Sequence, residues 1–80
     1  MKEISLLKLK KGIRAEIVGF SGMSGVVVKL RALGLCTGKI VKKISDIKLR
    51  GPVIVSVDRA QVAIGHTLAG KIMVRELKND

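Results

Sequence analysis

The residues of this 80-residue chain that most resemble a binding or reactive site lie between Gly34 and Gly38, where the glycines flank Cys36 and a threonine. A Walker phosphate-binding loop places four residues between its glycines and follows them with Lys and then Ser or Thr. Here three residues separate the glycines, and Ile40 stands where the magnesium ligand would be. The segment therefore lacks both the spacing and the ligand of a phosphate loop.

A second run of glycines, at positions 19, 22 and 25, follows a β-like segment and precedes a helix-like one. Helix N-termini bind anions, but the G-x-x-G-x-x-G spacing is not that of the dinucleotide fingerprint. A chain of 80 residues also leaves no room for the second half of a dinucleotide fold. We expect a flexible turn here.

The chain has one histidine, His66, and one cysteine, Cys36. Neither belongs to a C-x-x-C or H-x-x-x-H pair, and no Ser, His and Asp follow the pattern of a catalytic triad. We expect no enzymatic activity, no cofactor and no metal site within one chain. A metal site between subunits and a metal-sensing role stay open. A single cysteine cannot form an internal disulfide, which agrees with a reducing compartment.

The charge is strongly basic, because 16 Lys and Arg residues face 6 Asp and Glu residues, for a net charge of +10. Such a surface attracts nucleic acids, anionic lipids or acidic protein faces. Proteins that bind single strands usually stack bases on aromatic rings, and Phe20 is the only aromatic residue. We therefore expect no specific nucleic acid partner. Without a long apolar run or a signal peptide, the chain is expected to be cytoplasmic.

Apolar periodicity predicts one domain over residues 1–80 with a mainly β fold. Strands are expected at 13–18, 40–49, 53–57, 62–64 and 72–77, a helix at 23–33, and a single helical turn within 65–70. The strand at 40–49 should carry an exposed lysine-rich side, and Gly51-Pro52 should form the turn after it. About five short strands and one inserted short helix fit a small, partly open barrel of SH3-like size. The β-branched run at 26–28 favours a strand instead, so the helix at 23–33 has an alternative.

The segment from Leu30 to Gly38 has a mechanical interpretation. If the helix ends at Leu33, Gly34 adopts the left-handed conformation and Leu35 folds back onto Leu30 in a Schellman motif. Gly38 then provides the tight turn into the next strand. The segment would be an elbow between a helix and a strand.

The same elbow resembles the hallmark of the FeoA family (ferrous iron transport protein A), a short helix running into Leu-Gly-Leu, a turn and a strand. The residues that carry the resemblance are Leu30, Leu33, Gly34, Leu35 and Gly38, together with residues 6–12, Gly51-Pro52 and the pattern from Val62 to Val74. In order, these elements extend over most of the chain. Thr37 departs from the family pattern, in which proline is usual.

The resemblance implies an SH3-like, non-enzymatic cytosolic accessory protein of FeoB, the ferrous iron transporter with a GTPase domain on its cytoplasmic side. Such a protein would lie at the inner face of the membrane through its partner. As a hypothesis, an apolar groove would dock on an acidic or amphipathic surface of the transporter. Its lining would be Val27, Leu30, Leu33 and Leu35, and its rim Lys29 and Arg31. The alternative is that these leucines belong to the core.

A rival interpretation starts from Lys11-Gly12 and the glycines that follow, which resemble the KOW motif of ribosomal and transcription-elongation proteins. That motif is also SH3-like and would bind RNA or the ribosome through the basic surface. It requires a strand at 26–30, so helix or strand in this segment discriminates between the two functions. The open apolar edge of a small barrel is also compatible with a homodimer.

Overall fold

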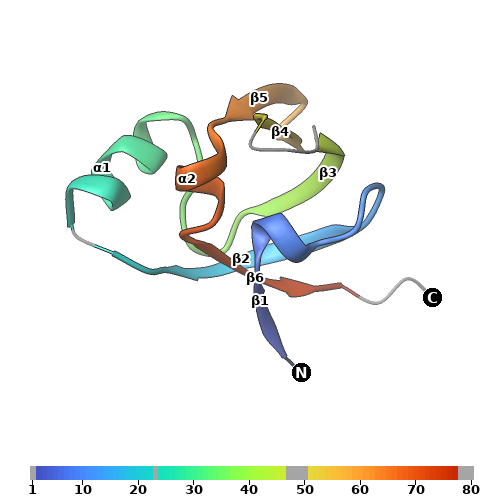
Figure 1. Ribbon diagram of the computed structural model, residues 1–80, viewed down its shortest axis with the longest axis horizontal. Helices are drawn as coiled ribbons and strands as arrows, with labels where there is room; N and C mark the ends of the chain where they lie inside the picture. The colour runs from blue at the N-terminus through green and yellow to red at the C-terminus, as the bar shows by residue number, and fades with distance from the viewer. Residues whose placement is uncertain (1, 23, 47–50, 78–80) are drawn as a thin grey trace.

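The computed structural model describes residues 2–22, 24–46 and 51–77, which form a strongly curved antiparallel sheet with short helices (Figure 1). The elements are β1 (Glu3–Ser5), the 3-10 helix η1 (Leu6–Lys8), β2 (Arg14–Phe20), α1 (Ser24–Ala32), β3 (Ile40–Asp46), β4 (Val53–Val57), β5 (Ala60–Ile64), α2 (His66–Ala69) and β6 (Ile72–Glu76). The sheet order is β1-β6-β2-β3-β4-β5. The predicted fold class, a small mainly β SH3-like barrel with an inserted short helix, is confirmed.

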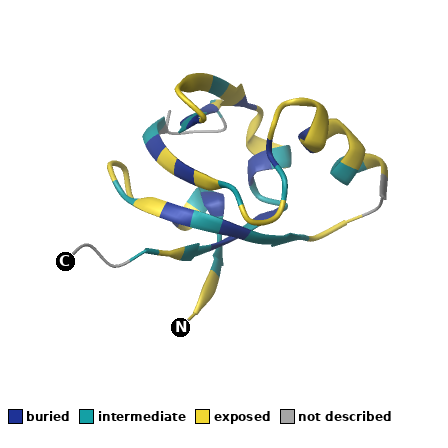
Figure 2. Ribbon diagram, turned by 180° about the vertical axis from the view of Figure 1, so that it is seen from behind, coloured by how far each residue is buried: buried dark blue, intermediate teal, exposed yellow. Residues whose placement is uncertain are grey.

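Alternating side chains place one face of the sheet in the core. In β4 the three valines are buried while Ile54 and Ser56 are only half-buried, and buried and exposed residues also alternate along the start of β3 (Figure 2). The core consists of small and medium aliphatic side chains. Its members are Leu6, Leu9, Ala15, Ile17, Leu30, Leu35, Val41, Val53, Val55, Val57, Ile64, Ala69, Ile72 and Val74.

Most of the strands predicted from the sequence lie within one or two residues of the observed ones, as β2, β4, β5 and β6 show. The helical turn expected between Gly65 and Gly70 is α2. The N-terminal elements β1 and η1 were missed. A three-residue strand is too short to show an alternation, and it is β1 that pairs with the closing strand β6 at one end of the sheet.

The prediction for β3 was wrong on one side chain. Lys43 was expected on an exposed lysine-rich side, but it is fully buried. Alternation places Lys43 on the core side with Val41, while Lys42 between them is exposed. The predicted strand also continued over residues 47–49 toward residue 50, which lie outside the described residues.

The buried ammonium of Lys43 has partners that explain its position. Its Nζ donates to the carbonyl oxygens of Leu6 at 3.3 Å, Leu7 at 3.0 Å and Leu9 at 2.8 Å. The last carbonyls of a helix have no partners within that helix, and a cation there is favourable. Lys43 therefore ties η1 to β3 across the core.

Helix α1 forms in spite of its three consecutive valines. It covers Ser24–Ala32, so the segment 26–30 is helical and not a strand. Met23, the first apolar residue of the predicted helix, lies outside the described residues. In Figure 1, α1 stands at the side of the barrel, at the far end from the turn that joins η1 to β2.

Candidate functional site: helix α1 and the turn that follows it

The end of α1 has the hydrogen bonds of a Schellman motif. The N–H of Leu35 donates to the carbonyl of Leu30 at 2.9 Å, and the N–H of Gly34 donates to the carbonyl of Arg31 at 2.9 Å. Gly34 has a φ of +86°, the left-handed conformation that glycine adopts without a steric penalty. This local geometry fixes where the chain leaves the helix.

A second tight turn leads from the helix into β3. The N–H of Lys39 donates to the carbonyl of Cys36 at 3.1 Å, and Gly38, with a φ of +95°, donates its N–H to the carbonyl of Ile17 at 2.8 Å. The two bends thus join α1 to the sheet as an elbow. Farther along the chain, Gly51 and Pro52 directly precede β4.

The structure divides the predicted docking residues into two groups. Leu30 and Leu35 have no exposed surface and belong to the core, so they cannot line a docking groove. Leu33 is 43% exposed, and Val27 is half-buried. The prediction of a docking groove is therefore wrong for Leu30 and Leu35, because these two leucines hold α1 and the elbow against the barrel.

The outward side of α1 carries an apolar residue that the sequence analysis did not select. Val28 is 67% exposed, the highest value among the exposed large hydrophobic residues of the described chain. Successive helical residues are rotated by about 100°, so Val28 lies on the side opposite the buried Leu30. The signal was available in this spacing, because a rotation of about 200° from Leu30 places Val28 outside the face that packs on the core.

Two cations flank this apolar position. Lys29 and Arg31 are both exposed, and α1 has no acidic residue in its first turn. By helical rotation both lie beside Val28 on the outward side. We define the α1 surface as Val27, Val28, Lys29, Arg31 and Leu33: apolar side chains that alternate with two cations around the helix, instead of a groove.

The stretch of sequence that contains this surface carries charges of one sign only. Between Glu16 and Asp46 the sequence contains no acidic residue. Of the basic residues in that interval, Lys43 is buried and Lys39 pairs with Asp58 at 2.5 Å. The exposed positive charges of α1 thus have no acidic neighbour along the chain that could neutralise them.

The ion pair at Lys39 is a structural contact at the end of the elbow. The carboxylate of Asp58 accepts a hydrogen bond from the Lys39 ammonium and attracts its charge, and both effects raise the pKa of Lys39 above its ordinary value of 10.5. Lys39 is therefore charged throughout the physiological pH range. The pair joins the start of β3 to the turn between β4 and β5.

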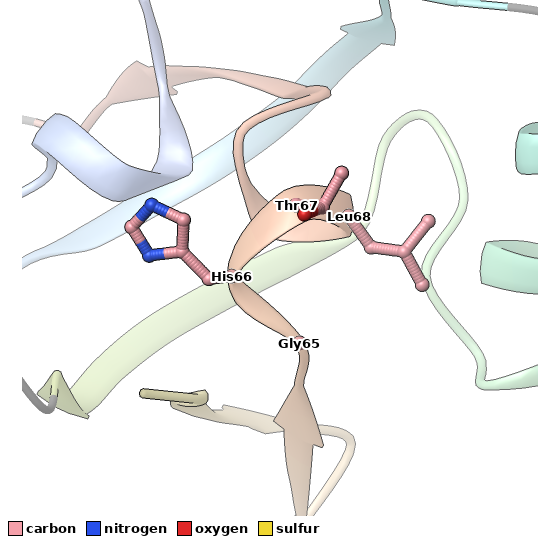
Figure 3. Close-up of a pocket in the computed structure, with 4 residues that line it drawn as sticks. All are labelled: Gly65, His66, Thr67 and Leu68. Atoms are coloured by element: carbon pink, nitrogen blue, oxygen red, sulfur yellow. The ribbon is translucent and has the colours of Figure 1, made fainter. Parts of the chain in front are cut away.

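A shallow pocket of about 510 Å³ is lined by Gly65, His66, Thr67 and Leu68. Figure 3 shows the His66 imidazole and the Leu68 side chain pointing to opposite sides of α2. Within the described ranges, no three His, Cys, Asp or Glu side chains gather into a metal-binding group. None of the helices described is long and apolar enough to cross a bilayer.

Comparison with known proteins identifies the family. The FeoA domain family matches residues 4–76 of this chain. The chain belongs to the FeoA family. The resemblance drawn from the elbow residues is therefore confirmed. No curated protein sequence matches the chain significantly.

Solved structures agree with this assignment. A crystal structure of an iron uptake regulatory protein (FeoA) is 31% identical with a TM-score of 0.86, covering 96% of this chain and all of its own. The FeoA protein from Chlorobium tepidum is 28% identical with a TM-score of 0.83, over 96% of this chain and 73% of its own. This FeoA domain also resembles part of a longer protein, T. acidophilum IdeR, at 26% identity and a TM-score of 0.82, over 95% of this chain and 35% of IdeR.

Proposed function

We propose that this protein is a non-enzymatic, cytoplasmic accessory protein of ferrous iron uptake. It docks through the α1 surface on the cytoplasmic, GTPase-bearing part of a FeoB-type transporter and lies at the inner face of the membrane through that partner. Membership of the FeoA family and the similarity to a FeoA named as an iron uptake regulatory protein support the link to iron uptake.

The observation that carries the docking proposal is the outward exposure of Val28 between two cations. An isolated exposed valine is ordinary, but here it lies on a nine-residue helix that also leaves Leu33 exposed at its end. A helix face on which an exposed valine lies between two cations fits an amphipathic acidic surface, whose carboxylates would meet Lys29 and Arg31. The basic charge of the whole chain would accelerate the encounter.

The KOW-like alternative requires a strand where α1 is helical. This observation counts against that alternative, as does the family match over residues 4–76. Binding of RNA through the basic surface remains measurable in the same experiment, because such binding falls steeply as salt is raised.

The test is a calorimetric titration of the purified protein against the soluble GTPase-bearing domain of the transporter from the same organism, with a structured RNA in a parallel arm. We expect saturable binding to the domain that Val28→Glu weakens at least tenfold, and weak, salt-sensitive RNA binding that this variant barely changes. Absence of binding to the domain, or equal affinity of Val28→Glu, would contradict the proposal.

A further inference from the structure

Strand β5 is the last strand of the sheet, and among the described strands only β4 pairs with it. Its five residues, Ala60–Ile64, contain no charged residue and no proline. Natural edge strands are usually blunted by charges, prolines or bulges, because an unpaired row of N–H and C=O groups invites another chain to pair with it. The edge of β5 has none of these protections.

The opposite edge of the same sheet provides a comparison. Strand β1 is only three residues long, and Glu3 at its start pairs with Arg75 of β6 at 3.5 Å. A short, charged edge discourages pairing. The two edges of one sheet thus differ in length and in charge, and β5 is the edge suited to accept a strand.

The turn before β5 determines which of its amides face outward. Asp58 and Arg59 form a two-residue connection with φ values of +49° and +67°, the positive values that a type I′ hairpin requires. In such a hairpin the flanking residues, Val57 and Ala60, are a hydrogen-bonded pair, and hydrogen-bonded and non-hydrogen-bonded pairs alternate from there. The register continues as Ser56↔Gln61, Val55↔Val62, Ile54↔Ala63 and Val53↔Ile64.

This alternation directs the backbone of Gln61 and Ala63 away from β4. Their N–H and C=O groups therefore lie along the open edge, and both residues are exposed. Beyond them the strand ends, because the carbonyl of Gly65 accepts from Ala69 in α2 at 2.9 Å. The pocket at Gly65–Leu68 directly follows this end, where an added chain would leave the edge.

Charge selects the occupant of the edge. A second copy would bring another net charge of +10 against the first, and this repulsion opposes self-pairing. At the hairpin end, Asp58 is already paired with Lys39, whereas Arg59 is exposed. An extended segment with acidic side chains is attracted both by the whole molecule and by Arg59.

We infer that β5 is a strand-accepting edge that binds an extended acidic segment of another protein as a seventh strand. Gln61 and Ala63 supply the backbone hydrogen bonds, which are sequence-tolerant, while the carboxylates of the segment provide preference for this basic domain. This surface is separate from α1, so its occupation does not depend on the docking proposed above.

Amide exchange and chemical shifts of the labelled protein test the inference, with a capped Glu-Val-Thr-Val-Glu peptide as the probe. In the free protein, the amides of Val62 and Ile64 should exchange slowly and those of Gln61 and Ala63 rapidly. Saturating peptide should slow exchange at Gln61 and Ala63 at least tenfold. A peptide with the same side chains but N-methylated throughout should have no effect.

Ala63→Pro is the matched protein variant, because proline removes an outward N–H without removing a hydrogen bond to β4. It should weaken peptide binding at least tenfold, whereas Val28→Glu should leave the peptide affinity within twofold. If Ala63→Pro disturbs the fold, the exchange pattern and the N-methylated peptide still decide the matter in the wild-type protein.

Three results would overturn the inference. The first is slow exchange at Gln61 and Ala63 in the dilute free protein, which would mean that the edge is already covered. The second is protection that grows with protein concentration without peptide, which would identify a second copy as the occupant. The third is the absence of saturable peptide binding, or peptide shifts confined to α1.

Discussion

Lys43 and Val28 both differ in burial from what is usual for their residue types, because lysine is ordinarily exposed and valine ordinarily buried. Lys43 is fully buried, whereas Val28 is 67% exposed. The lysine lies in the core because the carbonyls at the end of η1 accept its hydrogen bonds. The valine lies outside because Leu30 already holds α1 against the barrel. The burial of Lys43 therefore depends on its hydrogen-bond partners. The exposure of Val28 depends on its place on the helix, opposite the buried Leu30.

Replacing the buried lysine should have the largest effect on stability. Lys43→Met retains much of the volume but removes the donors from the carbonyls of Leu6, Leu7 and Leu9, so we expect the free energy of unfolding to fall by about 3 kcal/mol. Urea unfolding measures the change. The exposed neighbour is the control, and Lys42→Met should change stability by less than about 0.5 kcal/mol. Equal losses of stability in Lys43→Met and Lys42→Met would contradict a stabilising role for the hydrogen bonds of Lys43.

Truncation at Leu30 and at Val28 should change the stability of the protein to very different extents. Leu30→Ala deletes a fully buried side chain, so we expect a loss of about 2–3 kcal/mol in the free energy of unfolding. Val28→Ala removes exposed surface and improves helix propensity, so stability should stay within about 0.5 kcal/mol of wild type. Thermal and urea unfolding compare them, and a comparable loss in Val28→Ala would mean that this side chain is packed.

The elbow can be tested through two glycines that have equal space around them. A Cβ at Gly34 or at Gly25 would meet no atom within 4 Å, but only Gly34 has a positive φ, at +86°. Gly34→Ala should therefore cost about 1 kcal/mol through backbone strain, while Gly25→Ala inside α1 should stabilise by about 0.5 kcal/mol. Urea unfolding measures both changes, and the same sign in the two variants would contradict the Schellman account.

The smallest expected effect comes from the exposed pair of Lys39 and Asp58. The pair raises the pKa of Lys39, so its contribution to stability is present below the ordinary value of 10.5 and is lost as the pH rises through the higher folded value. Asp58→Asn keeps a residue that tolerates the left-handed turn. Comparing the pH dependence of unfolding, we expect a slight loss at pH 7 that salt reduces and that disappears at high pH. If the difference in stability between Asp58→Asn and the wild type persists at a pH above the pKa of Lys39, this ion pair is not its cause.

Much of the fold could be predicted because its signals are local. The alternation in β4 and the end of α1 at Gly34 depend on residues close together in the chain. The position of Lys43 could not be predicted this way, since its carbonyl partners lie 34 to 37 residues earlier. The packing of η1 against β3 brings them together, and sequence alone does not reveal that packing.

The candidate site was predicted only in part for a related reason. Apolar spacing identified α1 and the elbow, but a leucine that packs into the core and one that faces a partner have the same signature. Leu30 and Leu35 are in the core, while Leu33 remains exposed. The outward position of Val28 follows only once the buried side of the helix is known.

The central claim is that the α1 surface binds the cytoplasmic domain of the transporter, and charge reversal tests it most directly. Lys29→Glu with Arg31→Glu reverses two charges on α1, and Lys10→Glu with Lys11→Glu makes the same change in net charge at the turn on the far end of the molecule (Figure 1). At physiological salt, we predict that calorimetry finds at least a tenfold loss of affinity for the first pair and less than threefold for the second. Equal losses would show that only the overall charge matters and would contradict a docking surface on α1.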